Sequence, residues 1–289
     1  MYRLAGRGMV PTAVLAALAT VAACGFWADS DSRAGEPAGG SRHPDARSVA
    51  ALRAAEKATG RAGSARITST SVMGDLLAMK TDGALGWAGA ATGRLRLTYT
   101  GGQLAETMRK LNSSPMEARL LPDAYYAKVG DEFAARIHGK HWIRYDYDDL
   151  ASLPGGSGTY LKEQLANTAP IPPVKLLLVS RDVHRVGEEE VRGERTTRYS
   201  GTVDVADLKD TDALKAQLEQ AGVTTETVDV WVNGDDLLVK KVEKGELATG
   251  SMSSTAYYSD YGVRVSAQEP PAGDTADFQE LMKSQGATS

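Results

Sequence analysis

The stretch TETVDVWVNGDDLLVKKVEK, residues 225–244, decides the fold class of this chain. Two strand-like segments, 225–232 and 237–244, lie on either side of Asn233-Gly234. That dipeptide is the strongest hairpin signal in the chain, because both of its residues tolerate the positive φ that a two-residue turn needs. The sequence therefore predicts two neighbouring antiparallel strands, and with them an antiparallel sheet.

Similar segments continue on both sides of this hairpin. The alternation is clearest at 94–100, where Leu95, Leu97 and Tyr99 face one way and polar residues face the other. Turn signals such as Pro122-Asp123 separate the segments. Strands are expected at 66–72, 83–88, 94–100, 116–121, 124–129, 141–146, 183–191, 196–205, 225–232, 237–244, 252–258 and 262–267.

Helices are expected before, between and after these strands. Residues 44–59 carry a helical stripe that Ser48 would cap and that Gly60 and Gly63 would end. An apolar sheet face must be buried against another element, so the helices should cover one face of the sheet. The prediction is an α+β fold built on one large, curved antiparallel β-sheet. The other helices are expected at 159–168, 174–180, 207–221 and 275–283.

The N-terminus has the layout of a lipoprotein signal. Arg3 and Arg7 precede a short apolar segment, and Cys24, the single cysteine of the chain, ends the string TVAAC. A transmembrane helix would need about 20 apolar residues, and an ordinary secreted protein needs no cysteine at that place. The expected organisation is a signal peptide at 1–23, a lipidated Cys24 with a tether at 24–44, and one folded domain at 45–289.

Acyl chains such as palmitate on Cys24 would hold the mature protein to the cell membrane. Stable attachment takes at least two chains, which a lipobox cysteine normally carries. The protein would then lie on the extracytoplasmic face without spanning the bilayer. With no second cysteine it forms no intramolecular disulfide, so its stability must come from burial.

The charge balance limits the partners. Removal of Arg3 and Arg7 with the signal leaves 31 basic and 37 acidic residues, a net charge of −6. Nucleic-acid binding depends on clustered Lys and Arg, so nucleic acid is not expected as a partner. The same balance argues against electrostatic attraction to a membrane and leaves attachment to the lipid anchor.

Several segments in order resemble the LppX/LprG-type envelope lipoproteins (LppX_LprAFG), a family with a LolA-like fold. The resemblance covers roughly residues 45–285, and its most specific part is GEEEVRGERTTRYSGTVDV, residues 187–205. It implies a half-barrel sheet whose concave face is covered by helices. In several members the space between sheet and helices holds acyl chains. The other segments are LLPDAYYAKVG (120–130), GKHWIRYDYDDL (139–150), VDVWVNGDDLLVKKV (228–242) and YYSDYGVRVSAQEPPAGDTADF (257–278).

The strand alternation nominates side chains for the wall of such a cavity. The alternative is that these residues simply pack against the covering helices as core. Aromatic residues make up only 6% of the chain, which favours an interior that large rings do not fill. The candidates are Leu85, Trp87, Leu95, Leu97, Tyr99, Leu120, Tyr126 and Trp142.

No pattern in the sequence indicates catalysis, a cofactor or a metal. His138 and His141 flank a Gly-Lys turn, so their side chains should diverge, and the acidic run at 146–149 lacks the glycine and distal glutamate of a calcium loop. There is no GxSxG nucleophile motif. The glycine-rich residues 155–158 lack the Gly-Lys-Ser/Thr of a phosphate loop.

Two functions are compatible with these observations. The first is a membrane-anchored extracytoplasmic lipoprotein that binds or carries a lipid or lipoglycan in an apolar cavity. The second is a non-catalytic envelope sensor or scaffold, which would hold a partner protein and have no lipid cargo. A tethered hydrolase has no motif to support it.

Overall fold

The computed structural model describes residues 44–151, 169–208, 215, 223–247 and 250–286. All of these belong to one compact unit, residues 36–289. The predicted signal peptide, Cys24 and the tether up to residue 43 lie outside the described residues. So do the predicted helix at 159–168 and almost all of the one at 207–221.

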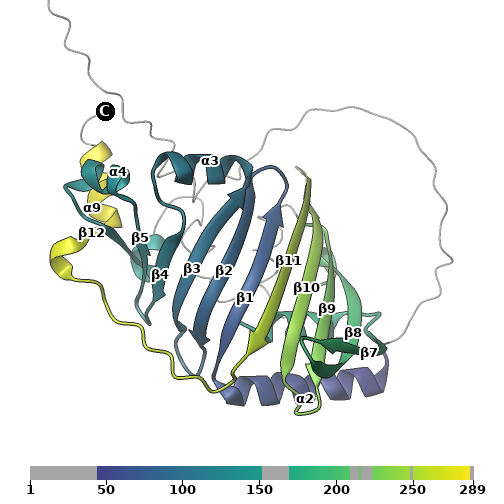
Figure 1. Ribbon diagram of the computed structural model, residues 1–289. Coiled ribbons are helices and arrows are strands. Elements are labelled where there is room, and N and C mark those ends of the chain that lie inside the picture. Colours follow the sequence, from purple (N-terminus) through teal and green to yellow (C-terminus); the bar gives the residue numbers. More distant parts are fainter. Residues whose placement is uncertain (1–43, 152–168, 209–214, 216–222, 248–249, 287–289) are drawn as a thin grey trace, which may run out of the picture. The chain divides into compact units, whose positions relative to one another are not determined.

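A single twelve-stranded sheet forms the core of the fold (Figure 1). The strand order is β12-β6-β5-β4-β3-β2-β1-β11-β10-β9-β8-β7. The predicted α+β class with one large antiparallel sheet is therefore confirmed. The strands are β1 (Ser64–Met73), β2 (Leu77–Gly86), β3 (Thr92–Gly101), β4 (Met116–Leu120), β5 (Ala124–Lys128), β6 (Trp142–Asp146), β7 (His184–Val191), β8 (Glu194–Asp204), β9 (Thr225–Asn233), β10 (Leu238–Leu247), β11 (Gly250–Ser259) and β12 (Thr275–Asp277).

The sheet consists of two meanders. In the first, β1 to β6 pair in chain order, and in the second β7 to β11 do the same. Antiparallel pairing of β1 with β11 joins them, with Ile67 opposite Tyr258. The short strand β12 pairs with β6 in parallel. Most pairings thus connect sequence neighbours, which is why the local strand signals were sufficient to predict the sheet.

The predicted hairpin of β9 and β10 forms, but its turn differs from the prediction. The backbone of Asn233 donates to Leu237 at 3.0 Å, and Asp236 donates to Asn233 at 3.2 Å. The positive φ of 60° belongs to Asp236, not to Asn233 or Gly234. The Asn233 side chain accepts from the amides of Asp235 and Leu237 instead. The loop is therefore one residue longer than the two-residue turn, and an asparagine side chain closes it.

Helix α2 (Ala46–Ala62) precedes the sheet, where a helix was expected at 44–59. Its N-cap is Asp45, whose carboxylate accepts from the Ser48 amide at 3.0 Å and from the Ser48 hydroxyl at 2.6 Å. The predicted cap, Ser48, is thus a buried residue of the first turn. Gly63 ends the helix in the left-handed conformation, with φ 71°. An aspartate is a strong N-cap because its carboxylate satisfies amides that have no intrahelical partner.

The remaining helices are short. Helix α7 begins in the Pro-rich segment, because proline is tolerated in the first turn of a helix. Helix α3 was not predicted from the sequence. These helices are α3 (Gly102–Lys110), α4 (Asp131–Ala134), α5 (Tyr147–Ala151), α7 (Ile171–Val179) and α9 (Phe278–Gly286), with single 3-10 turns at Ala135–Ile137, Val205–Asp207 and Ala272–Asp274.

The strand predicted at 262–267 is wrong. These residues form no ladder and instead cross the ends of the first-meander strands as an extended segment (Figure 1). The Gly262 amide donates to Ser64, the Ser64 hydroxyl donates to Val263, and Arg119 donates to the Gln268 carbonyl. The predicted helix at 275–283 begins only at Phe278, because β12 occupies the first three of those positions.

Candidate functional site

The sheet has two faces, and its register assigns each side chain to one of them. Residues directly opposite each other on neighbouring strands point to the same side. We call the side that carries one such row the inner face, and the opposite side the outer face. The row, from β9 to β3, consists of Val230, Lys241, Ala256, Ser69, Thr81 and Leu97.

Helices pack on the inner face at the second meander. Gly201 of β8 pairs with the inner residue Val228, and a side chain at Gly201 would come within 2.9 Å of Leu177 in α7. Helix α7 packs against α2 in turn. Helix α2 also contacts the β9–β10 turn, because the Thr59 hydroxyl accepts from the Leu238 amide at 3.2 Å. The predicted cover of helices is therefore present on the inner face.

Side chains of the inner face are buried near α2 and become more exposed with distance from it. At the closed level, Ile67, Leu95 and Tyr258 are 2%, 4% and 3% exposed. Two rows further along, Ser71, Met79 and their neighbours are only half-buried. The floor of this region consists of small side chains on β1, β2 and β11, of which Thr81 and Ala256 are buried and Ser69, Ser71 and Ser254 are half-buried. We call it the small-residue floor: Ser69, Ser71, Thr81, Gly83, Ser254 and Ala256.

Five of the eight predicted wall residues lie on the inner face. Leu85, Leu95 and Leu120 are buried, with at most 4% of their surface exposed. Leu97 and Tyr99 are half-buried and border the small-residue floor. Burial raises the pKa of Tyr99 to about 12, so its hydroxyl stays protonated at physiological pH. Leu97 and Tyr99 are thus the predicted residues best placed to touch a ligand.

The structure separates the other three predicted residues from these five. Tyr126 pairs with Arg144, and Trp142 with Lys128, on the outer face. The Arg119 guanidinium lies 4.4 Å from the Trp142 ring centroid. The reason is strand parity, because one residue along a strand reverses the face.

Trp87 lies beyond the end of β2 and points toward α2. Its indole donates to the Thr59 carbonyl at 3.1 Å, and its ring packs edge-on against Tyr261 at 6.3 Å. It anchors the helix to the sheet, so it does not face the same space as Leu97 and Tyr99.

Aromatic rings fill the β5–β6 end of the inner face. Tyr125 and Tyr145 lie 5.7 Å apart, and Tyr145 lies 4.8 Å from Phe278 of α9. Burial raises the pKa of Tyr145 above its usual range. The low aromatic content favoured an interior that large rings do not fill; at this end of the inner face, three of the few rings are gathered together.

A charged cluster lies on the inner face beside the small-residue floor. Lys241 is 4% exposed, and its ammonium contacts Glu243 at 2.7 Å. Glu226 is also 4% exposed, and within the described residues no hydrogen bond reaches its carboxylate. Glu243 pairs with Ser254 of the floor. A buried ion pair adds little net stability, but removal of one partner leaves the other charge buried without compensation.

Sequence reasoning missed this cluster, although it left a signal. Glu226 stands in the same phase as Val228 and Val230, so a charged residue occupies an otherwise apolar face. The floor left a similar signal in β1, where Ser69 and Ser71 follow Ile67 in the inward phase.

The titration of Glu226 gives a first prediction. Burial is the main reason that its pKa rises to about 8; Glu243 adds to the rise and Lys241 opposes it. The unfolded value is about 4.3, so the native state holds the extra proton between the two values. Stability should therefore fall as pH rises from about 4.3 to about 8, by at most about 1.4 kcal/mol per pH unit.

The variant Glu226→Gln should remove this dependence and gain stability over the wild type as the pH approaches 8. Urea unfolding of both proteins across this range measures the difference. Parallel stability curves for the two proteins would contradict the assignment.

Two open grooves occur among the described residues. One, of about 590 Å³, lies beneath α3 and includes Tyr99, Asp75 and Arg109. The other, of about 460 Å³, lies between α2 and α7 and includes Lys57, Arg61 and Lys175. Ligand pockets in proteins span about 300–1,000 Å³. Both grooves have the size of a small-molecule site, but polar side chains line much of each.

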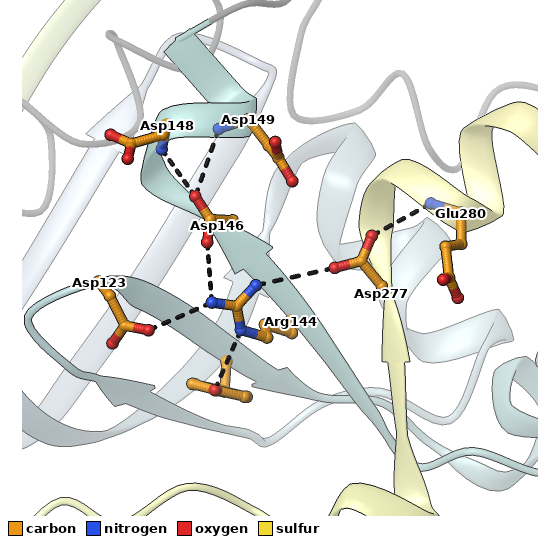
Figure 2. A network of polar contacts seen from close by, with 8 residues as sticks. Asp123, Arg144, Asp146, Asp148, Asp149, Asp277 and Glu280 are labelled. Carbon is orange, nitrogen blue, oxygen red and sulfur yellow. Dashed lines mark hydrogen bonds and ion pairs between the residues drawn. The ribbon is translucent and has the colours of Figure 1, made fainter.

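The acidic run at 146–149 is partly structural (Figure 2). Asp146 accepts from Arg144 at 2.8 Å and from the amides of Asp148 and Asp149. Burial pushes the pKa of Asp146 upward, but these hydrogen bonds outweigh it and hold the pKa below its usual value. Arg144 also contacts Asp123 and Asp277, and its Nε donates to Tyr126.

The two histidines of the Gly-Lys turn have separate environments. His138 adopts a left-handed conformation, with φ 60°, while His141 contacts Asp274 at 2.8 Å. In the part of the chain that the structure describes, no group of three His, Cys, Asp or Glu side chains could hold a metal ion. None of the described helices is long and apolar enough to cross a bilayer.

Comparisons with known proteins identify close relatives. No protein-family model matches the chain. It is 52% identical over 298 aligned positions to the "Putative lipoprotein SCO4650" of Streptomyces coelicolor, and the match covers 98% of both chains. It is also 49% identical over 250 positions to a 31.2 kDa protein of the rplA-rplJ intergenic region of Streptomyces griseus, across 83% of this chain and 82% of that one.

Among solved structures, the chain resembles the lipoprotein LppX of Mycobacterium tuberculosis. The TM-score is 0.50 and the sequence identity 16%, and the match covers 78% of this chain and all of LppX. At this identity the likeness concerns the fold, and it agrees with the segments that resemble the same family. The chain therefore belongs to the family of the Streptomyces coelicolor lipoprotein and has the fold of the LppX/LprG-type proteins.

Proposed function

We propose that this protein is a membrane-anchored extracytoplasmic lipoprotein that binds acyl chains over the small-residue floor of its inner face. The observation that carries the proposal is the floor itself. Small side chains such as Ser71 and Ser254 stand where a packed core would have large ones, and half-buried Leu97 and Met79 border them. Acyl chains gain free energy by leaving water for the apolar side chains that border the floor.

The mechanism requires no covalent chemistry. A chain of 16 carbons gains on the order of 12 kcal/mol on leaving water. It loses nearly as much on leaving a bilayer, so exchange between membrane and protein runs close to balance. That balance suits a carrier. The relative named as a lipoprotein supports the membrane anchor.

The second candidate is an envelope sensor or scaffold without lipid cargo. The aromatic rings around Tyr145 favour it, because at that end of the inner face the chain's own side chains pack against one another. The two candidates differ in one measurable property, which is the presence of a bound lipid.

The decisive experiment is mass spectrometry of organic extracts of the mature chain without its lipidated cysteine, residues 25–289, purified from a Streptomyces host. This chain lacks Cys24 and thus any covalent acyl group. About one equivalent of acyl lipid per protein is expected. Repeated preparations without lipid would exclude the carrier and leave the scaffold.

The anchor makes a separate prediction. Cys24→Ala in the full chain should move the protein from the membrane fraction to the soluble or unprocessed pool, because the thioether chains supply the attachment. Fractionation of cells followed by immunoblotting measures the shift. Ser30→Ala, a substitution shortly after the cysteine, is the matched control and should leave the protein at the membrane. Unchanged retention of the Cys24 variant after high-salt and carbonate washing would show that lipid does not hold it.

A further inference from the structure

Positive charge is concentrated on the outer face of the sheet. On β2, β3 and β10 and in the β7–β8 turn, five cationic residues of this face have no ion-pair partner among the residues that the structure describes. Four of them, Lys80, Arg96, Arg192 and Lys244, are exposed, and Lys240 is half-buried. We call the set the outer basic patch: Lys80 on β2, Arg96 on β3, Arg192 after β7, and Lys240 and Lys244 on β10.

Most other cations of this face are already neutralised. Arg66 contacts Asp260 at 3.1 Å, Arg94 contacts Glu117 at 3.0 Å, and Arg198 contacts Asp229 at 3.1 Å. Lys128 on β5 is also exposed on this face without an ion pair, and its ammonium lies 6.0 Å from the Trp142 ring centroid. The five cations of the patch therefore remain available to an external partner, with Lys128 at the β5 end of the same face.

Few acids offset the patch. Asp82 is exposed opposite Arg96, and Glu246 is exposed two positions after Lys244 on the same face. Glu189 also interacts with Lys240, although it is paired with Arg198, and Glu117 lies opposite Arg96 but is paired with Arg94 and Arg119. Asp82, Glu246 and Glu189 together do not balance five cations. The patch therefore carries an excess of positive charge on a chain whose net charge is −4.

Aromatic rings hold part of the patch in place. The Lys240 ammonium lies 4.0 Å from the Trp231 ring centroid and 5.7 Å from that of Tyr257. The Arg192 guanidinium lies 3.8 Å from the Tyr257 ring and donates to the Thr68 hydroxyl at 2.9 Å. Cation–π contacts of this kind hold the two charged side chains at the surface of the sheet. The side chains are therefore less free to reach acidic residues elsewhere.

Apolar and amphipathic groups accompany the charges. Val72 on the same face of β1 is 38% exposed, and Tyr257 is half-buried on the neighbouring strand β11. Tyrosine rings and Lys or Arg heads are the groups that favour the interface between a membrane and water. Val72, Tyr257 and the cations of the patch lie on neighbouring strands of one continuous surface. They can therefore contact the same partner at the same time.

We propose that the outer basic patch rests on an anionic lipid surface, which orients the anchored protein with its inner face away from the membrane. Each Lys or Arg near an anionic bilayer adds to the attraction, which falls off within a Debye length. Cys24 and Asp45 are separated by 21 residues, which reach at most about 70 Å. That length lets the sheet lie flat against the membrane that holds the anchor.

The proposal goes beyond acyl-chain binding and does not depend on it. The net charge of the whole chain argued against electrostatic attraction to a membrane. That argument averages over both faces, whereas a surface meets only one of them.

Vesicle sedimentation tests the proposal with residues 25–289, the mature chain without its lipidated cysteine, which carries no acyl anchor. Vesicles of phosphatidylcholine alone are compared with vesicles made of phosphatidylcholine and phosphatidylglycerol in equal amounts. We expect at least about tenfold tighter binding to the anionic vesicles. The binding should disappear near 1 M salt, where the Debye length is about 3 Å. Absence of binding to anionic vesicles, or equal binding to both kinds, would overturn the proposal.

Charge reversal on the patch supplies the second arm. Lys80→Glu with Arg96→Glu should weaken binding at least about tenfold. The matched control, Arg53→Glu with Lys57→Glu, makes the same change of charge at exposed positions of α2 and should change binding less than about twofold. Equal losses in both variants would mean that total charge, and not this face, governs binding.

Two further measurements keep the outcome clear. Circular dichroism confirms that each variant is folded, and Lys244→Glu tests the patch on a third strand if the double variant fails to fold.

Binding to soluble dextran sulfate without binding to anionic vesicles would reject the membrane as the partner. Ser71→Leu, which fills the small-residue floor, should leave vesicle binding unchanged, so failure of the acyl-binding proposal remains separate from failure of this one.

Discussion

Replacement of Lys241 by methionine is expected to lower the free energy of unfolding by about 3–5 kcal/mol. The Lys241 ammonium lies 2.7 Å from Glu243 and is 4% exposed, and Glu226 is buried nearby. Without the ammonium, carboxyl groups are left in a region that cannot solvate a negative charge. Urea unfolding of the mature chain at pH 8, followed by circular dichroism, measures the loss.

Two variants separate this effect from a general loss of charge. Lys240→Met, at the adjacent residue on the outer face, removes a partly exposed cation and should cost less than about 1 kcal/mol. Lys241→Met combined with Glu243→Leu should recover much of the stability, because a buried pair replaced by apolar groups is often neutral or stabilising. A loss for Lys241→Met no greater than that for Lys240→Met would contradict the buried-cluster interpretation.

Filling the small-residue floor should abolish ligand binding. Ser71→Leu places a large side chain in the half-buried region between Met79 and Ser254, where the acyl chain is proposed to lie. The expected result is at least a tenfold fall in the amount of acyl lipid that co-purifies with the mature chain. The ratio of lipid to protein, measured by mass spectrometry, is the readout.

The neighbouring residue supplies the matched control. Thr70→Leu makes a similar change on the same strand, but Thr70 is exposed on the outer face. It should leave the ratio of lipid to protein unchanged, and both variants should keep wild-type strand content. If Ser71→Leu retained the wild-type ratio of lipid, the ligand would have to bind elsewhere than over the floor.

The cavity prediction shows where reasoning from alternation succeeds and where it stops. Within one strand the alternation assigned Leu95, Leu97 and Tyr99 to a common face, and the register agrees. Across strands the phase is set by where each strand begins and how it pairs, so Tyr126 and Trp142 came to the opposite face. Trp87 was assigned to a strand that ends at Gly86.

Similar reasons account for the errors at the ends of elements. The strand expected at 262–267 has the alternation of a strand, with Val263 and Val265 in phase. The segment crosses the ends of the strands instead of running alongside one of them. Its backbone therefore makes isolated hydrogen bonds with Ser64 and forms no ladder. Ser48 was expected to cap helix α2, but Asp45 offers the stronger acceptor one turn earlier.

The sequence by itself determined the antiparallel sheet, the leading helix and the expectation of a lipid-modified cysteine, because these depend on alternation, capping and short motifs that neighbouring residues carry. Only the tertiary structure decided that β1 pairs with β11, and this pairing brings Ser71 of the first meander beside Ser254 of the second. It also decided which face of the sheet Lys240 points to and which Lys241 points to. These features depend on contacts between residues far apart in the chain, for which local patterns carry no signal.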